Sequence, residues 1–206
     1  MNTNLPYTVY EKQKLSEAEF GRISTFVTSN YGIRLPKEKK VMVEGRLQKR
    51  LRATGSTSFK QYLELVFGDH GETELVNMID AISTNKTDFY RESAHFDFLT
   101  NTVLPQFREK NQKRSLSIWS SAASTGEEIY TMAMVLEEYN LKQSIDKQLD
   151  YRILGTDISV EALKQAVNAV YKFERIKDVP FDIRGKNFLK SKNRESNTVR
   201  VLPRLR

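Results

Sequence analysis

Two adjacent glutamates at the start of an expected helix are the first residues in this sequence with the type and spacing to do chemistry. Residues 118–134, IWSSAASTGEEIYTMAM, pass from an apolar stretch through small and hydroxyl residues to one glycine and an amphipathic pattern. That strand–loop–helix order usually presents backbone N–H groups to an anion. A phosphate loop needs a lysine at this place, whereas this loop has Glu127 and Glu128. Two carboxylates there repel phosphate and favour a ligand that carries an ammonium or sulfonium group.

The same two glutamates also have a purely structural interpretation. Ser124 and Thr125 could each cap the helix, with a glutamate three positions later in a capping box that suits the helix dipole. In the functional interpretation, Glu127 caps the helix and Glu128 faces the ligand. The loop alone does not decide between the two interpretations.

A third carboxylate follows the second expected strand. Asp157 comes directly after the apolar run Tyr151–Thr156. An acidic residue at this place in a nucleotide-binding sheet commonly accepts hydrogen bonds from both ribose hydroxyls. Asp157 could instead cap the next helix, but Ser159 is better placed for that. Together the two acidic turns predict a nucleoside ligand with a positive charge and no phosphates, and S-adenosylmethionine has both features.

The elements that must position these residues begin with a helical unit. Residues 16–82 carry apolar residues at helical spacing in four runs, separated by glycine or proline. Ser16 and Glu19 form a capping-box pattern before the first run, and Gly32 and Gly55 are expected to end the first and second helices. We therefore expect a four-helix domain over residues 1–82.

The pattern changes after this unit. Residues 83–92, STNKTDFYRE, have no clean period and predict a linker, followed by a helix that ends near Pro105. Over residues 93–206 helices alternate with strands, which predicts a parallel, doubly wound sheet. The expected strands are Leu116–Trp119 and Tyr151–Thr156, and the expected helix after the second strand carries the apolar residues Leu163, Ala166, Val167 and Val170. The tail ends in the strand-like alternation Thr198–Leu202.

Composition limits the classes of protein that fit. The chain has 206 residues, a net charge of +7 and no cysteine, which excludes disulfides and thiolate metal sites. It has two histidines, so we expect no metal site. The first residues lack the apolar run of a signal peptide and nothing later is long enough to span a bilayer, so a cytoplasmic protein is expected. The basic balance predicts an acidic partner, which could be nucleic acid, an anionic membrane surface or an acidic protein.

Four stretches in order resemble one known family. TNKTDFYRE, HFDFLTNTVLP, IWSSAASTGEEIYTMAM and ILGTDIS are similar to motifs of the CheR family, the chemoreceptor glutamate methyltransferases, and GRLQKRLRATG resembles the family's N-terminal domain. The resemblance implies a Rossmann-like domain that takes S-adenosylmethionine as cofactor and methylates receptor glutamates. It places on the cofactor site the residues Asn85, Thr87, Arg91, Ala122, Glu128 and Asp157. We expect Arg91 to have a catalytic role, orienting the reacting carboxylate or the cofactor beside it.

The resemblance also gives two departures and one gap. The family usually has phenylalanine where this chain has Tyr90 and proline where it has Ile129. In the family, residues corresponding to 171–206 begin a small antiparallel subdomain that can bind a receptor's C-terminal peptide, after which the chain returns to the main sheet. Here the sequence ends at VLPRLR, so we expect an incomplete sheet with exposed edges and apolar helix faces.

Basic residues on the second helix gain an interpretation from the same resemblance. Arg46, Lys49 and Arg50 can share one helix face. Such a face is usually just solvated, and the resemblance raises the alternative that it docks onto the acidic receptor helices. Two other functions remain open: a protein that binds the cofactor and receptor without catalysis, and a nucleic-acid methyltransferase or nucleic-acid-binding protein suggested by the basic charge alone.

Overall fold

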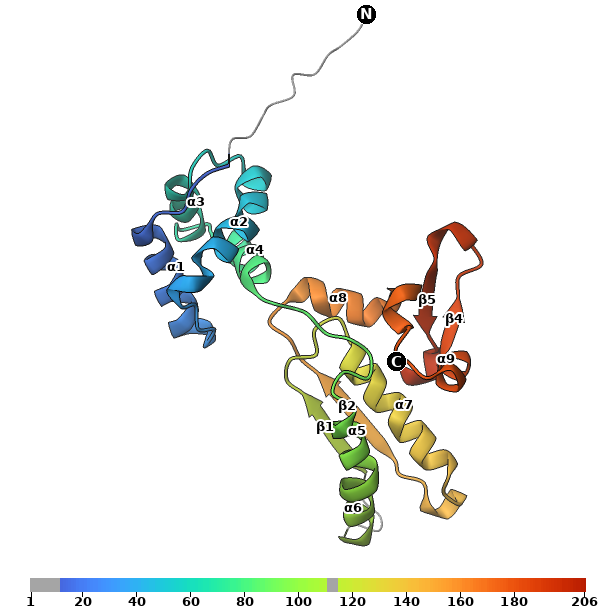
Figure 1. Ribbon diagram of the computed structural model, residues 1–206. Coiled ribbons are helices and arrows are strands. Elements are labelled where there is room, and N and C mark those ends of the chain that lie inside the picture. Colours follow the sequence, from blue (N-terminus) through green and yellow to red (C-terminus); the bar gives the residue numbers. More distant parts are fainter. Residues whose placement is uncertain (1–11, 111–114) are drawn as a thin grey trace, which may run out of the picture. The chain divides into compact units, whose positions relative to one another are not determined.

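The computed structural model describes residues 12–110 and 115–206. The chain divides into a first unit that ends at Thr84 and a second that begins at Asn85 (Figure 1). Each unit has its own buried core, so each is described by itself.

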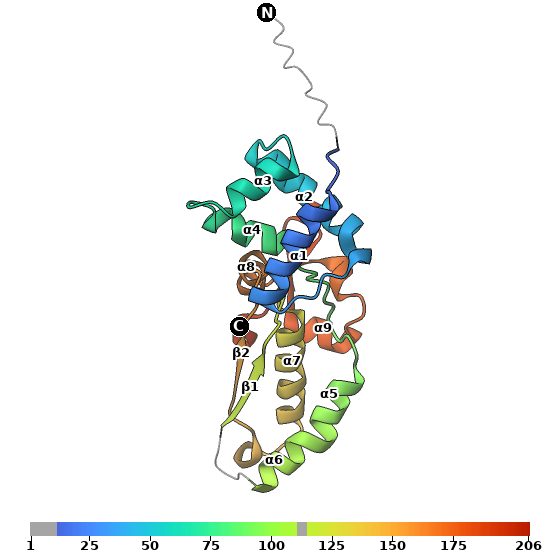
Figure 2. The ribbon, with the colours of Figure 1, turned by 90° about the vertical axis from the view of Figure 1, so that its left-hand side faces the viewer.

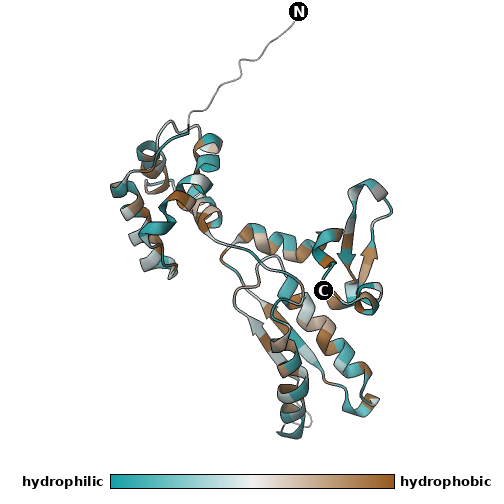
Figure 3. Cartoon of the chain, viewed as in Figure 1, coloured by the Kyte–Doolittle hydropathy of each residue, from teal (hydrophilic) through white to brown (hydrophobic). Residues whose placement is uncertain are grey.

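The first unit is helical and contains α1 (Glu17–Tyr31), α2 (Lys40–Thr54), α3 (Phe59–Val66) and α4 (Glu72–Ile82). The expected capping box is confirmed, because Ser16 accepts from the backbone of Glu19 and the Glu19 side chain accepts from the backbone of Ser16. Gly32 and Gly55 end α1 and α2 with positive φ angles of 68° and 71°, which glycine adopts without steric cost. Hydrophobic and hydrophilic residues alternate along these helices (Figure 3), and the apolar ones form a single core.

The second unit begins with the loop after α4 and a helix that is longer than expected. Helix α5 (Ala94–Phe98) continues through a π-helical turn, Leu99–Val103, into α6 (Leu104–Lys110). The expected end near Pro105 is therefore wrong. In the π turn the N–H of Leu104 bonds to the carbonyl of Leu99, five residues earlier. This wider turn precedes Pro105 and lets the helix pass a residue that cannot donate the usual bond.

The parallel pairing is confirmed. Strands β1 (Leu116–Ser120) and β2 (Tyr151–Gly155) run parallel, with Ile118 opposite Ile153. Helix α7 (Glu127–Leu141) connects them and lies against one face of the pair beside α5 and α6 (Figure 2). The core on this face joins Leu104 of α6, Leu116 of β1 and Leu136 of α7.

The other face of the strand pair is open in the described part of the chain. Trp119 and Leu154 lie opposite each other in the register and are 68% and 61% exposed. Within the described ranges no further strand joins β1 and β2. This is the incomplete sheet that the sequence predicts, with apolar residues on its exposed face.

A small antiparallel sheet follows α8 (Val160–Asn168). It contains β3 (Val170–Lys172), β4 (Phe188–Lys190) and β5 (Thr198–Val201) in the order β3-β5-β4, with α9 (Phe181–Asn187) preceding β4. The expectation that Val170 belongs to the preceding helix is wrong, because Ala169 takes a left-handed conformation (φ 53°) that ends α8. The expected antiparallel subdomain is confirmed.

Candidate functional site

Asp157 fastens the loop that follows β1 to the end of β2. Its Oδ2 accepts the backbone N–H of Ser124 at 2.7 Å, and its Oδ1 accepts the backbone N–H of Ser159 at 2.8 Å. Ser159 caps α8, as expected, by accepting the N–H of Ala162. Each carboxylate oxygen has two lone pairs, so both oxygens of Asp157 keep acceptor capacity for a ligand hydroxyl.

The start of α7 is not the expected capping box. Its N-cap is Gly126, and no side chain within the described ranges caps the helix. Gly126 has a φ of 94°, and a Cβ there would lie 2.9 Å from the Cβ of Ala166 and 3.0 Å from the hydroxyl of Tyr171. The capping interpretation of Ser124 and Thr125 is therefore wrong, because the tight approach of two other segments requires glycine at the cap.

The two glutamates of α7 have different environments. Glu127 is fully buried and accepts from Arg175 at 2.6 Å and from the hydroxyl of Thr125. Glu128 is exposed, and its Oε1 accepts from the hydroxyl of Ser120 at 2.8 Å. The prediction that Glu127 caps the helix is wrong, since its carboxylate is consumed by an ion pair. Glu128 has the exposure that the ligand interpretation requires.

The segment 85–91 lies against this loop and helix. The hydroxyl of Ser124 donates to the carbonyl of Asn85 at 2.9 Å. Further along, the N–H of Tyr90 donates to the hydroxyl of Thr131, which itself donates to the carbonyl of Glu127. Tyr90 takes a left-handed conformation with a φ of 55°. Side-chain hydroxyls on the loop and on α7 thus fix the segment at both of its ends.

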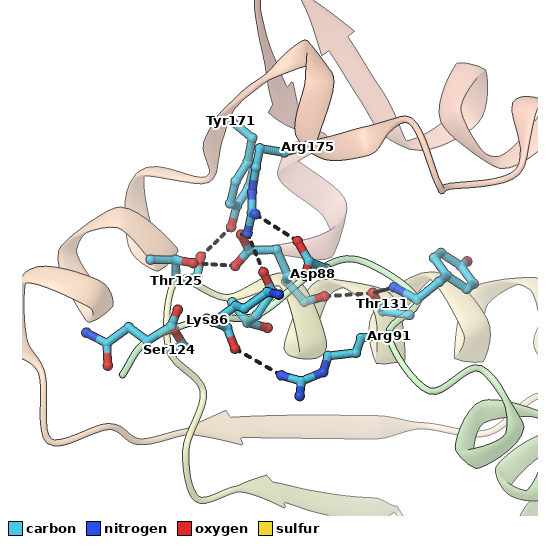
Figure 4. Close-up of polar contacts among 12 residues, drawn as sticks. Lys86, Asp88, Arg91, Ser124, Thr125, Thr131, Tyr171 and Arg175 are labelled. Carbon is cyan, nitrogen blue, oxygen red and sulfur yellow. Dashed lines mark hydrogen bonds and ion pairs between the residues drawn. The ribbon is translucent and has the colours of Figure 1, made fainter. Parts of the chain in front are cut away.

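Arg91 is exposed at the end of this segment. Its guanidinium donates to the carbonyl of Lys86 at 3.0 Å, and its backbone N–H donates to the carbonyl of Asp88. These contacts close the segment into a compact turn (Figure 4). The remaining donors of the guanidinium are available for an anionic group.

Arg175 holds the centre of the arrangement and was not identified from the sequence. It lies in the short helix Phe173–Ile176, after β3. Its guanidinium donates to Asp88 at 2.7 Å, to Glu127 and to the carbonyl of Thr87 (Figure 4). These ion pairs raise the pKa of Arg175, chiefly through the hydrogen bond to Glu127. Nothing in the run KFERIKD distinguishes this arginine from its charged neighbours.

The structure thus brings three separate parts of the chain to one edge of the strand pair: the segment that contains Asn85 and Thr87, the loop that contains Ala122, and Asp157. Ala122 is exposed on its loop. The edge presents the carboxylates of Glu128 and Asp157 beside the start of α7. This acidic edge suits a ligand with hydroxyls and a positive charge and opposes a phosphate.

Comparison with known proteins identifies the family. Residues 85–204 match the sequence model of the CheR methyltransferase SAM-binding domain, and residues 18–83 match the CheR methyltransferase all-alpha domain. The chain belongs to the CheR methyltransferase family. The two matches meet within two residues of the division between the two units.

Three curated relatives share this family. A chemotaxis protein methyltransferase of Borreliella burgdorferi is 38% identical over 81% of this chain and 59% of its own length. One of Escherichia coli is 32% identical over 97% of this chain and 66% of its own length. Chemotaxis protein methyltransferase 2 of Pseudomonas aeruginosa is 32% identical over 100% of this chain and 71% of its own length. The chain therefore spans about three-fifths to seven-tenths of these CheR relatives.

Within the CheR all-alpha domain, two of the three basic residues expected to dock a partner are engaged inside the domain. Arg46 donates to the carbonyls of Ile82 and Ser83 at 2.5 and 2.9 Å, where it satisfies the C-terminal end of α4. Arg50 forms a two-point ion pair with Glu74 at 2.9 and 2.5 Å. Lys49 is exposed between them in sequence. The three side chains therefore do not present one common basic face.

Glu74 gathers several donors in the core of the CheR all-alpha domain. It is 9% exposed and accepts from Arg50, from the hydroxyl of Tyr62 at 2.8 Å and from Asn77. Burial raises the pKa of Glu74, but the hydrogen bonds from Arg50, Tyr62 and Asn77 outweigh it and hold the pKa below its ordinary value. The pair of Arg50 and Glu74 is thus a structural element of the domain.

Proposed function

We propose that this chain forms part of an S-adenosylmethionine-dependent protein-glutamate O-methyltransferase that methylates chemoreceptors during chemotactic adaptation. The observation that carries the proposal is the acidic edge, where Asp157 ties the loop of Ser124 to the end of β2 while Glu128 stays exposed. The relatives named as chemotaxis protein methyltransferases support the same reaction class.

The residues at this edge fit the cofactor in kind. Asp157 would accept the ribose hydroxyls, because both of its oxygens keep a lone pair. Glu128 would face the positively charged methionine part, since a carboxylate on the first turn of α7 attracts a cation. Asn85, Thr87 and Ala122 would line the site from the segment and the loop that Ser124 joins.

Catalysis in this proposal depends on positioning. When bound, S-adenosylmethionine supplies an electrophilic methyl group on a sulfonium. A free glutamate has a pKa of about 4.3, so the accepting carboxylate is already ionised at neutral pH and needs no general base. Arg91, exposed at the end of its turn, would orient that carboxylate through its remaining donors. Removing water from the carboxylate would increase its reactivity further.

Receptor docking is proposed for the exposed basic residues of the all-alpha domain. Lys49 is free of the internal contacts that hold Arg46 and Arg50, so it is the best remaining candidate of the three. Attraction of this kind to acidic receptor helices should weaken with salt. A receptor's C-terminal peptide is a second proposed partner, at the antiparallel subdomain. No helix in the described part of the chain is long and apolar enough to cross a membrane, and a cytoplasmic location is proposed.

A second candidate function is binding of the cofactor and receptor without methyl transfer. It is favoured by the length of the chain relative to its relatives and by the exposed face of Trp119 and Leu154. The experiment that separates the two combines calorimetric titration with S-adenosylhomocysteine and transfer of a radiolabelled methyl group to receptor-containing membranes. Binding with transfer supports the enzyme, binding without transfer supports the second candidate, and neither result overturns both.

A further inference from the structure

Arg175 contacts the two stretches that carry the proposed cofactor residues from opposite sides. One nitrogen of its guanidinium donates to the carboxylate of Asp88, and the other donates to Glu127 and to the carbonyl of Thr87. Thr87 and Asp88 belong to the segment 85–91, whereas Glu127 is the first residue of α7. A single side chain therefore spans from the segment to the helix whose next residue is Glu128 (Figure 4).

The energetics of this contact make it selective for arginine. The carboxylate of Glu127 is fully buried, and a buried charge without a partner is strongly destabilising. Arginine offers several N–H donors in a rigid planar fork, so it can satisfy a carboxylate and a carbonyl at the same time. Lysine would supply the charge but not the fixed geometry.

A second contact from the same part of the chain supports the first. The hydroxyl of Tyr171, on β3, donates to the carbonyl of Thr125 in the loop before α7 at 2.6 Å. Tyr171 is buried and packs edge-on against Phe89 of the segment, with ring centroids 5.0 Å apart. The start of the antiparallel subdomain thus contacts both the loop and the segment, through one buried ring and one guanidinium.

We propose that Arg175 is a positioning residue for cofactor binding. It fixes the segment containing Asn85 and Thr87 against the first turn of α7, so that these residues and Glu128 face the same ligand. The inference rests on the proposed function, because it assigns a role toward the S-adenosylmethionine site. It extends that function by making the beginning of the antiparallel subdomain part of the cofactor site's support.

The test measures the affinity of the 206-residue chain for S-adenosylhomocysteine by calorimetry, together with its thermal unfolding midpoint. Arg175→Met should weaken binding at least tenfold and lower the midpoint, since it leaves Glu127 unpaired. The matched control is Arg200→Gln, which changes an exposed arginine of β5 in the same subdomain and should bind as the unmodified chain does.

A double variant separates positioning from stability. Glu127→Gln with Arg175→Met removes the buried charge together with its partner, so the unfolding midpoint should recover relative to Arg175→Met. The affinity should stay at least tenfold weak, because nothing then holds the carbonyl of Thr87. Arg175→Lys, which keeps the charge, should fold well and bind with intermediate affinity.

Recovery of both affinity and midpoint in the double variant would overturn the inference, and so would unchanged affinity in Arg175→Met. If the double variant or Arg175→Lys folds like the unmodified chain and binds as tightly, the positioning role is wrong even if Arg175→Met fails to fold. Lack of binding by the unmodified chain is a different result, which contradicts the proposed function itself.

Discussion

Asp157 accepts the backbone N–H of Ser124 at 2.7 Å across 33 positions of sequence. Ser124 in turn donates its hydroxyl to the carbonyl of Asn85, so one serine connects the end of β2 to the segment 85–91. Ser124 takes a left-handed conformation with a φ of 49°, which the contacts on both of its polar groups stabilise. The candidate site is therefore one connected network rather than three independent motifs.

Asp157→Asn tests the end of this network. Asparagine keeps one carbonyl oxygen, so one of the two backbone contacts is retained, and we expect a loss of about 1–2 kcal/mol in the free energy of unfolding. Binding of S-adenosylhomocysteine should weaken at least tenfold, because the ribose loses a charged acceptor. Calorimetry and urea unfolding measure the two effects. Asp97→Asn, on exposed α5, is the control, and equal affinity in both variants would refute the ribose role of Asp157.

Arg91→Ala tests the proposed orientation of the reacting carboxylate. Arg91 is exposed and its guanidinium bonds to one backbone carbonyl, so the free energy of unfolding should change by about 0.5 kcal/mol or less. Methyl transfer should fall by about a hundredfold, as expected when a positioned substrate loses its alignment. A loss of turnover no larger than the loss of folded protein would contradict the role.

Arg50→Met tests whether the ion pair with Glu74 is structural. Glu74 would keep its hydrogen bonds from Tyr62 and Asn77 but lose its charged partner in a mostly buried position. We expect the free energy of unfolding to fall by about 2 kcal/mol, less than for a fully buried pair because Arg50 is partly exposed. Lys49→Met, on the exposed side of the same helix, should cost little. Similar costs for the two variants would mean that the ion pair contributes nothing specific.

The same carboxylate predicts a dependence of stability on pH. The pKa of Glu74 is lower in the folded chain than its ordinary value, so its contribution is complete above the unfolded pKa of about 4.3 and is lost as pH falls through the folded pKa. The free energy of unfolding should therefore drop on acidification below about pH 5. In Glu74→Gln this drop should be smaller, and an identical pH profile in the two proteins would show that Glu74 is not responsible.

Tyr90→Phe should stabilise the chain. The hydroxyl of Tyr90 is buried and finds no hydrogen-bond partner among the described residues. Burial, with smaller effects from Glu138 and Asp182, raises the pKa of Tyr90 to about 12. Removing an unpaired hydroxyl from such a place should raise the free energy of unfolding by about 1 kcal/mol. Destabilisation by the same amount would show that the hydroxyl has a partner in solution.

Local signals in the sequence predicted much of the fold. The capping box at Ser16, the left-handed glycines Gly32 and Gly55 and the apolar runs of β1 and β2 each depend on neighbouring residues, and each is confirmed. The helix around Pro105 was mispredicted because a π turn, which has no simple sequence signature, compensates for the missing N–H.

The site was less accessible to sequence reasoning, because its decisive contacts are long-range. Glu127 has the pattern of a helix cap, yet its partner Arg175 lies 48 positions later. Gly126 reads as an ordinary loop glycine, while its role depends on the approach of Ala166 and Tyr171. Arg46 and Arg50 look like part of a solvated basic face until α4 supplies acceptors for both.

The most direct test of the account is calorimetric titration of the 206-residue chain with S-adenosylhomocysteine, with adenosine diphosphate as the comparison ligand. The acidic edge formed by Glu128 and Asp157 predicts saturable binding of one S-adenosylhomocysteine per chain, competed by S-adenosylmethionine, and much weaker binding of the diphosphate. Tighter binding of the diphosphate, or no saturable binding of S-adenosylhomocysteine by the folded chain, would contradict the assignment of this edge as the cofactor site.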